Sequence, residues 1–199
     1  MSSTNTASDE LRQLLTEYCN HKRNISNIEN VKNLLNQVSE DLRYGLLGDY
    51  GTTVLAVAAK RGHTELCVTL LSSLPPADRL KLILVTKYTA LHSAASKGHT
   101  ETVSGILNCL SADQQLQLLF TLDSDGDTAL HDAALNGHTE IVKTLLDNLR
   151  PEQQLQLLSV QNYDGKTAFQ RAADDKQKET QMILKKYERY ADFEVNYGK

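Results

Sequence analysis

Five of the six histidines recur at fixed places in three similar stretches of the chain. His92 and His131 occur in T-A-L-H, and His63, His99 and His138 each follow a glycine. Imidazole is a common zinc ligand, but a zinc site needs three or four ligands that converge on one point. Each kind of histidine occurs about once per stretch, so its members are spread along the chain. We therefore expect these histidines to bond the backbone and side chains of turns, and we expect no metal site.

A second group that could do chemistry is the acidic run of Asp123, Asp125 and Asp127, which has the composition of a calcium loop. The EF-hand loop needs glycine at its sixth position and an acidic residue at its twelfth. Counting from Asp123, the glycine is fourth and the twelfth residue is Ala134. The spacing does not fit, and we interpret the run as an acidic turn without a cofactor.

No arrangement of residues is typical of catalysis. The sequence contains no glycine-rich phosphate loop, no G-x-S-x-G and no Cys/His pair with suitable spacing. His131 and Asp132 are adjacent, but neighbours on a helix point ~100° apart and form no relay. We expect a protein that is not an enzyme, with an enzyme or a small-ligand binder as an alternative.

The cysteines Cys19, Cys67 and Cys109 are odd in number and widely spaced. Unpaired thiols are normal in a reducing compartment, whereas small secreted domains use paired cysteines. Cys67 falls on the apolar stripe of a predicted helix, so we interpret it as a small core residue. We expect a cytoplasmic protein, or one translocated into a host cell if it is a bacterial effector.

Composition excludes several classes of partner. The net charge is −4, which gives no reason to expect nucleic acid. No apolar stretch approaches the ~20 residues that a membrane span needs. The start, MSSTNTASDE, has neither a basic region nor an apolar core, so we expect no signal peptide. Hydrophobic residues make up 40% of the chain, which is typical of a folded protein.

These residues are positioned by a repeat. Thr53, Thr89, Thr128 and Thr167 occupy equivalent positions, 36, 39 and 39 residues apart. A fixed period of this size is typical of stacked helical arrays. Each copy predicts a turn, a short helix capped by the threonine, a glycine such as Gly137 in the left-handed conformation, and a second, amphipathic helix.

An insertion after the second helix predicts a third, short helix on the outer side of each copy. It covers Pro75–Val85, Ser111–Thr121 and Arg150–Val160, with leucines at matching positions. Ser111 with Gln114 can form a capping box. This insertion lengthens the period.

The motif T-A-L-H-x-A-A-x-x-G-H-T-E-x-V resembles the ankyrin repeat, whose usual form is T-P-L-H-x-A-A-x-x-G-H. The resemblance covers roughly Ile28 to Lys186. It implies an all-α ankyrin-repeat solenoid, built of stacked helix-turn-helix units with β-turn fingers. The period exceeds the family's ~33 residues. Alanine or valine replaces the family's proline, at Val54, Ala90, Ala129 and Ala168.

We divide the chain accordingly. A flexible N-terminus (1–7) precedes a degenerate capping repeat (8–48), in which Ser8 caps a helix over Asp9–Cys19. Repeats follow over 49–85, 86–121 and 122–160. A degenerate C-terminal capping repeat and tail cover 161–199, and we expect the last helix to run a turn or two past Tyr187.

The resemblance implies a protein–protein interaction module, an adaptor or scaffold, whose turn tips and first helices grip a partner protein on a concave face. The alternative is a secreted effector of an intracellular bacterium that binds host proteins. By motif position we expect the exposed partner-binding residues to be Tyr50, Val57, Lys60, Arg61, Lys87, Tyr88, Ser93, Ser96, Lys97, Asp125, Asp127, Asp132, Leu135, Asn136, Tyr163, Asp164, Lys166 and Arg171.

The charges of this set are separated along the chain. Basic residues lie in the first two full copies, aspartates in the third, and Lys166 and Arg171 near the C-terminal end. In a straight array these charges form separate patches. We expect a monomer whose partner presents acidic groups to the first copies and basic groups to the third.

Overall fold

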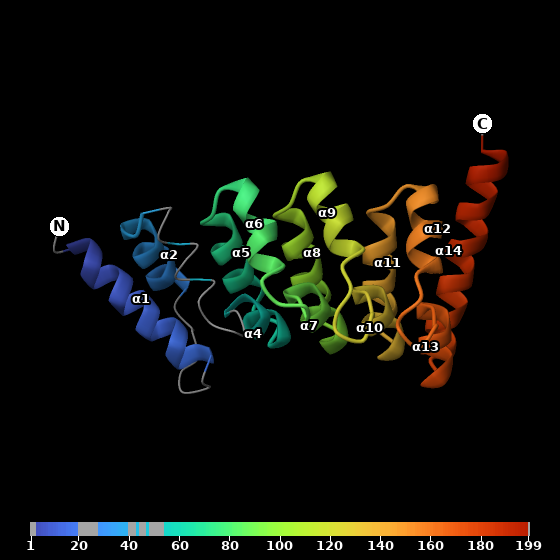
Figure 1. Ribbon diagram of the computed structural model, residues 1–199, viewed down its shortest axis with the longest axis horizontal. Helices are drawn as coiled ribbons and strands as arrows, with labels where there is room; N and C mark the ends of the chain where they lie inside the picture. Colours follow the sequence, from blue (N-terminus) through green and yellow to red (C-terminus); the bar gives the residue numbers. More distant parts are fainter. Residues whose placement is uncertain (1–2, 20–27, 40–42, 44–46, 48–53, 199) are drawn as a thin grey trace.

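The computed structural model describes residues 3–19, 28–39, 43, 47 and 54–198, and shows an elongated stack of helices with the two termini at opposite ends (Figure 1). The described residues form helices and no strand. The predicted all-α solenoid is therefore confirmed.

The first helices of the copies are short and form one row. Alanine fills the positions at which they meet; in α7, Ala94 and Ala95 are fully buried, as Ala133 and Ala134 are in α10. Small side chains let neighbouring helices approach closely, so each first helix covers the next. The row consists of α4 (Val54–Lys60), α7 (Ala90–Lys97), α10 (Ala129–Leu135) and α13 (Ala168–Asp174).

The second helices form a parallel row and supply most of the large core side chains. In α11 the stripe of Ile141, Val142, Leu145 and Leu146 is fully buried. The stripe repeats in each copy, so the core runs through the whole stack. This row consists of α2 (Ile28–Gln37), α5 (Thr64–Ser72), α8 (Thr100–Asn108), α11 (Thr139–Asp147) and α14 (Lys178–Tyr197).

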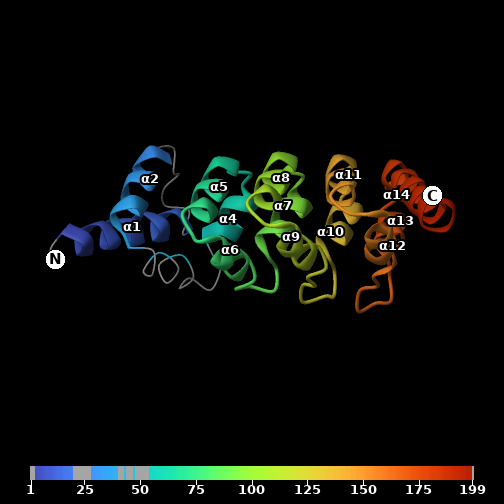
Figure 2. The same ribbon diagram turned by 90° about the horizontal axis from the view of Figure 1, so that it is seen from above.

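The predicted third helix is present in each full copy and forms a row of its own (Figure 2). Ser111 and Gln114 form the predicted capping box of the second one. Proline begins the other two. These helices are α6 (Pro76–Ile83), α9 (Ala112–Leu119) and α12 (Pro151–Ser159).

A side chain on the third helix ties it to the end of the second, which sequence analysis did not anticipate. Gln115 Nε2 donates to the carbonyls of Leu107 and Leu110, and Gln154 repeats this one copy later. In earlier copies arginine takes the position and reaches further: Arg79 donates to Leu74 O and, across the copy boundary, to Cys109 O. The signal was a polar residue at a constant position, 36 and 39 residues apart.

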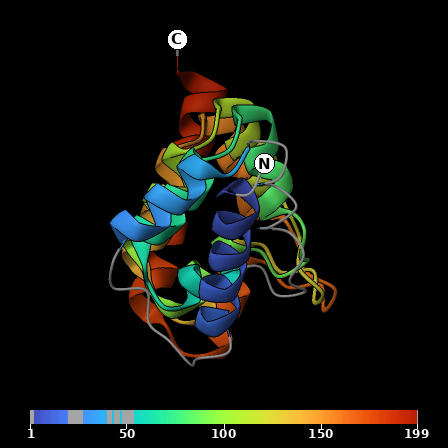
Figure 3. The same ribbon diagram turned by 90° about the vertical axis from the view of Figure 1, so that its left-hand side faces the viewer.

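The two ends differ from expectation. Helix α1 (Ser3–Cys19) begins before Ser8, and its buried Ala7 and Leu11 pack it across the N-terminal end of the stack (Figure 3). Helix α14 continues to Tyr197, nearly three turns past Tyr187 and so about one turn further than predicted. It packs along α12 as well as α11 and α13, and Ala191 is buried there, so tertiary contacts extend the helix.

Left-handed glycines end the first helices as predicted. Gly62, Gly98 and Gly137 have φ of 72°, 78° and 74°. In the fourth copy Lys176 takes the same position and still has φ 58°. The space for a Cβ is also occupied: at Gly137 it would overlap the side chain of Gln177 from the next copy.

Replacing Leu146 tests the core. Its side chain is fully buried between copies, so Leu146→Ala leaves a cavity and should lower the free energy of unfolding by ~2–5 kcal/mol. Leu122→Ala is the matched control: Leu122 is 37% exposed and its loss should stay below ~1 kcal/mol. Denaturant unfolding measures both. Equal losses would mean that the stack does not depend on this stripe.

Alanine substitutions at two glycines can distinguish the cost of a left-handed backbone from the cost of crowding the added Cβ. Gly165 has φ 73° with no atom within 4 Å of a Cβ position, whereas Gly137 has φ 74° and a crowded one. Gly165→Ala should cost ~1–2 kcal/mol through the left-handed backbone alone. Gly137→Ala should cost more in denaturant unfolding. An equal cost would show that Gln177 moves aside freely.

Candidate functional site

The first helices and the turns before them form one continuous surface, which we call the first-helix face. Its described part consists of α4, α7, α10 and α13 and the fingers, defined as residues 85–88, 122–127 and 161–166. The fingers extend together from one side of the stack (Figure 2).

The second and third fingers are built by their own side chains. Asp123 Oδ1 accepts from the backbone N–H of Asp125 at 2.8 Å and of Asp127 at 2.9 Å. Asn162 does the same with Asp164 and Lys166 in the next finger. The carboxylate and the amide therefore hold the loops closed, and the acidic run is a turn, as predicted.

Histidines tie each finger to the preceding first helix. His92 Nε2 donates to the carbonyl of Asp127 at 3.1 Å, while Nδ1 bonds the hydroxyl of Thr89 at 2.8 Å. His131 repeats the arrangement with Lys166 and Thr128. Burial lowers the pKa of both imidazoles, because a buried ring is harder to charge.

The other three histidines form hydrogen bonds with the preceding unit of the stack. His99 Nε2 donates to Lys60 O and His138 Nε2 donates to Ser96 O, each across a copy boundary. His63 bonds the hydroxyl of Tyr18 in α1 at 2.7 Å. All five histidines thus join neighbouring units, and among the described residues no group of His, Cys, Asp and Glu has a metal-binding arrangement.

The predicted partner-binding residues fall into four groups. Lys60, Lys87, Tyr88, Lys97, Asp125, Asn136, Tyr163 and Asp164 are exposed. Val57, Arg61, Ser96, Leu135, Lys166 and Arg171 are partly buried. Ser93, Asp127 and Asp132 are buried, so the expectation that they are exposed was wrong. Tyr50 lies outside the described residues.

Arg61 is engaged within the molecule. Its guanidinium lies 4.5 Å from the centre of the Tyr18 ring, and Nη1 donates to Tyr18 O at 3.1 Å. It therefore helps to attach α1 to the stack. The exposed basic side chains at this end of the face are those of Lys60, Lys87 and Lys97.

Asp127 is buried because the next copy provides its partners. Arg171 Nη2 lies 2.8 Å from Asp127 Oδ2, and Asn162 Nδ2 donates to Oδ1 at 2.8 Å. A buried carboxylate needs such partners to stay charged. This aspartate holds the second and third fingers together.

Asp132 has no such partners. It is 8% exposed, no hydrogen bond to its side chain is present among the described residues, and Oδ2 is buried without a donor. Burial raises the pKa of its carboxyl to about 8, with Asp123 and Asp127 adding repulsion and Arg171 opposing it. It occupies the position of Ser93 in the previous copy and Arg171 in the next.

Two tyrosines are exposed on the fingers. Tyr163 is 73% exposed at the third finger tip, where its N–H donates to Asp125 O. Tyr88 is 40% exposed and packs against the His92 ring. Burial raises the pKa of Tyr88, and the nearby carboxylates of Asp132, Asp123 and Asp127 add to it.

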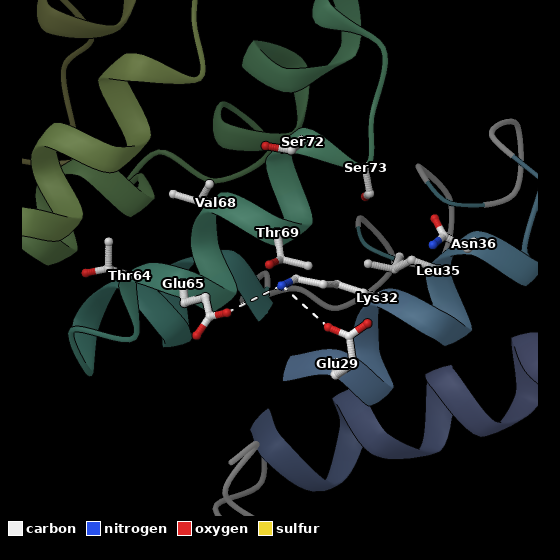
Figure 4. Close-up of a pocket in the computed structure, with 10 residues that line it drawn as sticks. All are labelled: Glu29, Lys32, Leu35, Asn36, Thr64, Glu65, Val68, Thr69, Ser72 and Ser73. Atoms are coloured by element: carbon white, nitrogen blue, oxygen red, sulfur yellow. Dashed lines mark hydrogen bonds and ion pairs between the residues drawn. The ribbon is translucent and has the colours of Figure 1, made fainter. Parts of the chain in front are cut away.

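In the row of second helices, a groove of about 760 Å³ separates α2 from α5 (Figure 4). Lys32 spans it, with Nζ 3.8 Å from Glu29 and 3.4 Å from Glu65. The other lining residues are Leu35, Val68 and short polar side chains, which form no catalytic arrangement.

The thiols are structural where they are described. Cys67 is fully buried, as predicted, and burial raises its pKa to about 12. Burial also raises the pKa of Cys109. Neither forms a disulfide. No helix within the described ranges is long and apolar enough to cross a membrane.

Comparison with known families supports the repeat. A sequence model described as ankyrin repeats (3 copies) matches residues 18–117, 74–156 and 112–197, which together span most of the chain. A search of curated proteins found no match.

Removing the charge of Asp132 tests its burial. Between pH 4 and 8 the unfolded carboxyl has lost its proton while the folded one keeps it, so its contribution to stability falls as pH rises through this range. Asp132→Asn should therefore raise the free energy of unfolding by ~1–3 kcal/mol at pH 8, and by much less at pH 4.

Urea unfolding at both pH values measures this effect. The control is Asp125→Asn, an exposed carboxylate of the adjacent finger, which should change stability by less than ~0.5 kcal/mol. A loss of stability in Asp132→Asn at pH 8 would contradict the assignment, and would mean that Arg171, whose Nε also lacks a partner, turns to Asp132 in solution.

Proposed function

Since this chain belongs to the ankyrin-repeat family, we propose that it is a non-enzymatic interaction module that binds a partner protein on its first-helix face. Ankyrin repeats are generally protein–protein interaction modules. The observation that carries the proposal is variation at solvent-facing positions within one chain, while the core positions repeat.

One position on the first helix illustrates this variation. It holds Lys60, Ser96, Leu135 and Asp174 in successive copies, whereas the buried position two residues earlier is alanine every time. Packing requires the alanine but places no such demand on the outer position. A lysine, a serine, a leucine and an aspartate in one line make a surface that is specific to this chain.

The tyrosines supply candidate anchors. Tyrosine is enriched among residues that dominate binding energy, because it buries a large rigid ring and keeps a hydroxyl for hydrogen bonding. Tyr163 and Tyr88 project from neighbouring parts of the same face, one on each side of the acidic finger. A partner that covers both rings would also cover Asp125.

The exposed charges favour one orientation of the partner. Lys60, Lys87 and Lys97 lie toward the N-terminal end, and Asp125 and Asp164 lie on the later fingers. Such separated charges mainly set orientation and association rate. We propose that the partner presents acidic groups to the first copies, and that binding takes place in a reducing compartment, in keeping with the unbridged Cys67 and Cys109.

Capture with the intact chain, followed by affinity measurement on the protein obtained, tests the face. Tyr163→Glu should weaken binding at least ~10-fold, since it removes an aromatic anchor and adds a charge. Tyr197→Glu is the matched control, because Tyr197 is 72% exposed but lies at the end of α14. Equal affinity of both variants and the unmodified chain would place the binding site elsewhere.

A further inference from the structure

We propose, on the basis of the proposed function, that Asp132 is the acceptor for one lysine or arginine side chain of the partner protein. The position lies in α10, in the middle of the first-helix face, and retains a small exposed area. A carboxylate forms charge-assisted hydrogen bonds with a guanidinium or an ammonium, and these are stronger than bonds between neutral groups.

The first step of the argument is the missing partner. Asp127, a few residues away, has a guanidinium and an amide on its two oxygens. Asp132 is buried to a similar degree and has neither. A carboxyl group that is desolvated without a donor is difficult to ionise in the unbound protein, and a cation supplied by a partner would stabilise its ionised form.

The second step is the charge around it. Asp123, Asp125 and Asp127 lie near enough to raise the pKa of the Asp132 carboxyl. Arg171 is the cation that opposes them, and its guanidinium is held by Asp127 at 2.8 Å. These residues therefore provide four carboxyl groups and one guanidinium. This excess of acidic groups makes the surroundings of Asp132 attractive to a further positive charge.

The third step is the aromatic side chain of Tyr88 near Asp132. The Tyr88 ring belongs to the finger before α7, is 40% exposed, and lies close enough to Asp132 for the aspartate charge to raise the pKa of the tyrosine, after the larger effect of burial. An aromatic face beside a carboxylate suits the stem of a lysine or the plane of an arginine. An acidic side chain at the same place would be repelled by Asp132 and by its neighbours Asp123, Asp125 and Asp127.

A metal ion does not fit this place. No metal-binding group of three or more ligands forms within the described part of the chain, and Asp123 uses Oδ1 to accept from two backbone N–H groups of its own finger. A single basic side chain needs only one carboxylate, and Asp132 provides one with a small exposed area.

Binding of a cation should release a proton. The charged and titratable groups that act on Asp132, or on which it acts, are Tyr88 from the first finger, Asp123, Asp125 and Asp127 from the second, and Arg171 from α13. Because these surroundings favour the protonated carboxyl, an incoming cation shifts it to the ionised form. Affinity should therefore rise between pH 6 and pH 8.

Random 12-residue peptides displayed on phage and selected on the intact chain provide the probe. Synthetic copies of the selected peptides should contain an essential lysine or arginine. Replacing that residue by glutamine should lower affinity at least tenfold for the unmodified chain and less than threefold for Asp132→Asn, since both changes remove the same ion pair. Asp125→Asn, an exposed acidic neighbour, is the matched control and should retain the tenfold effect.

The outcomes separate the two proposals. Peptides that lose binding in Tyr163→Glu but show independent effects of Asp132→Asn and of the glutamine replacement would overturn the role of Asp132 and leave the first-helix face as the site. Peptides insensitive to both Tyr163→Glu and Asp132→Asn would overturn both proposals. Affinity that does not change between pH 6 and pH 8 would also count against Asp132.

Discussion

The structure depends on neutral imidazoles that join neighbouring copies. Each of His92 and His131 uses one nitrogen to accept from a threonine and the other to donate to a carbonyl of the next finger. A charged ring carries a proton on both nitrogens, so Nδ1 could no longer accept, and the bond from the Thr128 N–H to His131 would be lost. Since burial lowers the pKa of these rings, the unfolded chain takes up protons first as pH falls below ~6.5, and the stack is destabilised by acid.

The features that were predictable from sequence are local or periodic. Helix positions, the left-handed Gly137, the capping box at Ser111 and the third helix all follow from residues within one copy. The features that were not predictable depend on the neighbour. Asp127 is buried because Arg171 and Asn162 reach it from the next copy, and α14 continues to Tyr197 because α12 packs along it.

The same limit applies to the candidate site. Ser93, Asp132 and Arg171 share one position in the repeat, and motif position alone assigned all three to the surface. The first is a small buried serine, the second an unpartnered carboxyl, and the third binds Asp127. The contacts with the adjoining copies decide between these outcomes, and an alignment of the repeats does not show which side chains are in contact.

The side chains packed against the left-handed glycines determine which repeats could be duplicated within such a chain. The ring of His99 fills the space beside Gly62, and that of His138 the space beside Gly98. A tandem duplication of residues 99–137 would place a histidine against a glycine at each new seam. Interior copies can therefore be duplicated without losing this contact. In the last copy Gln177 takes the place of the histidine, and this copy ends the array.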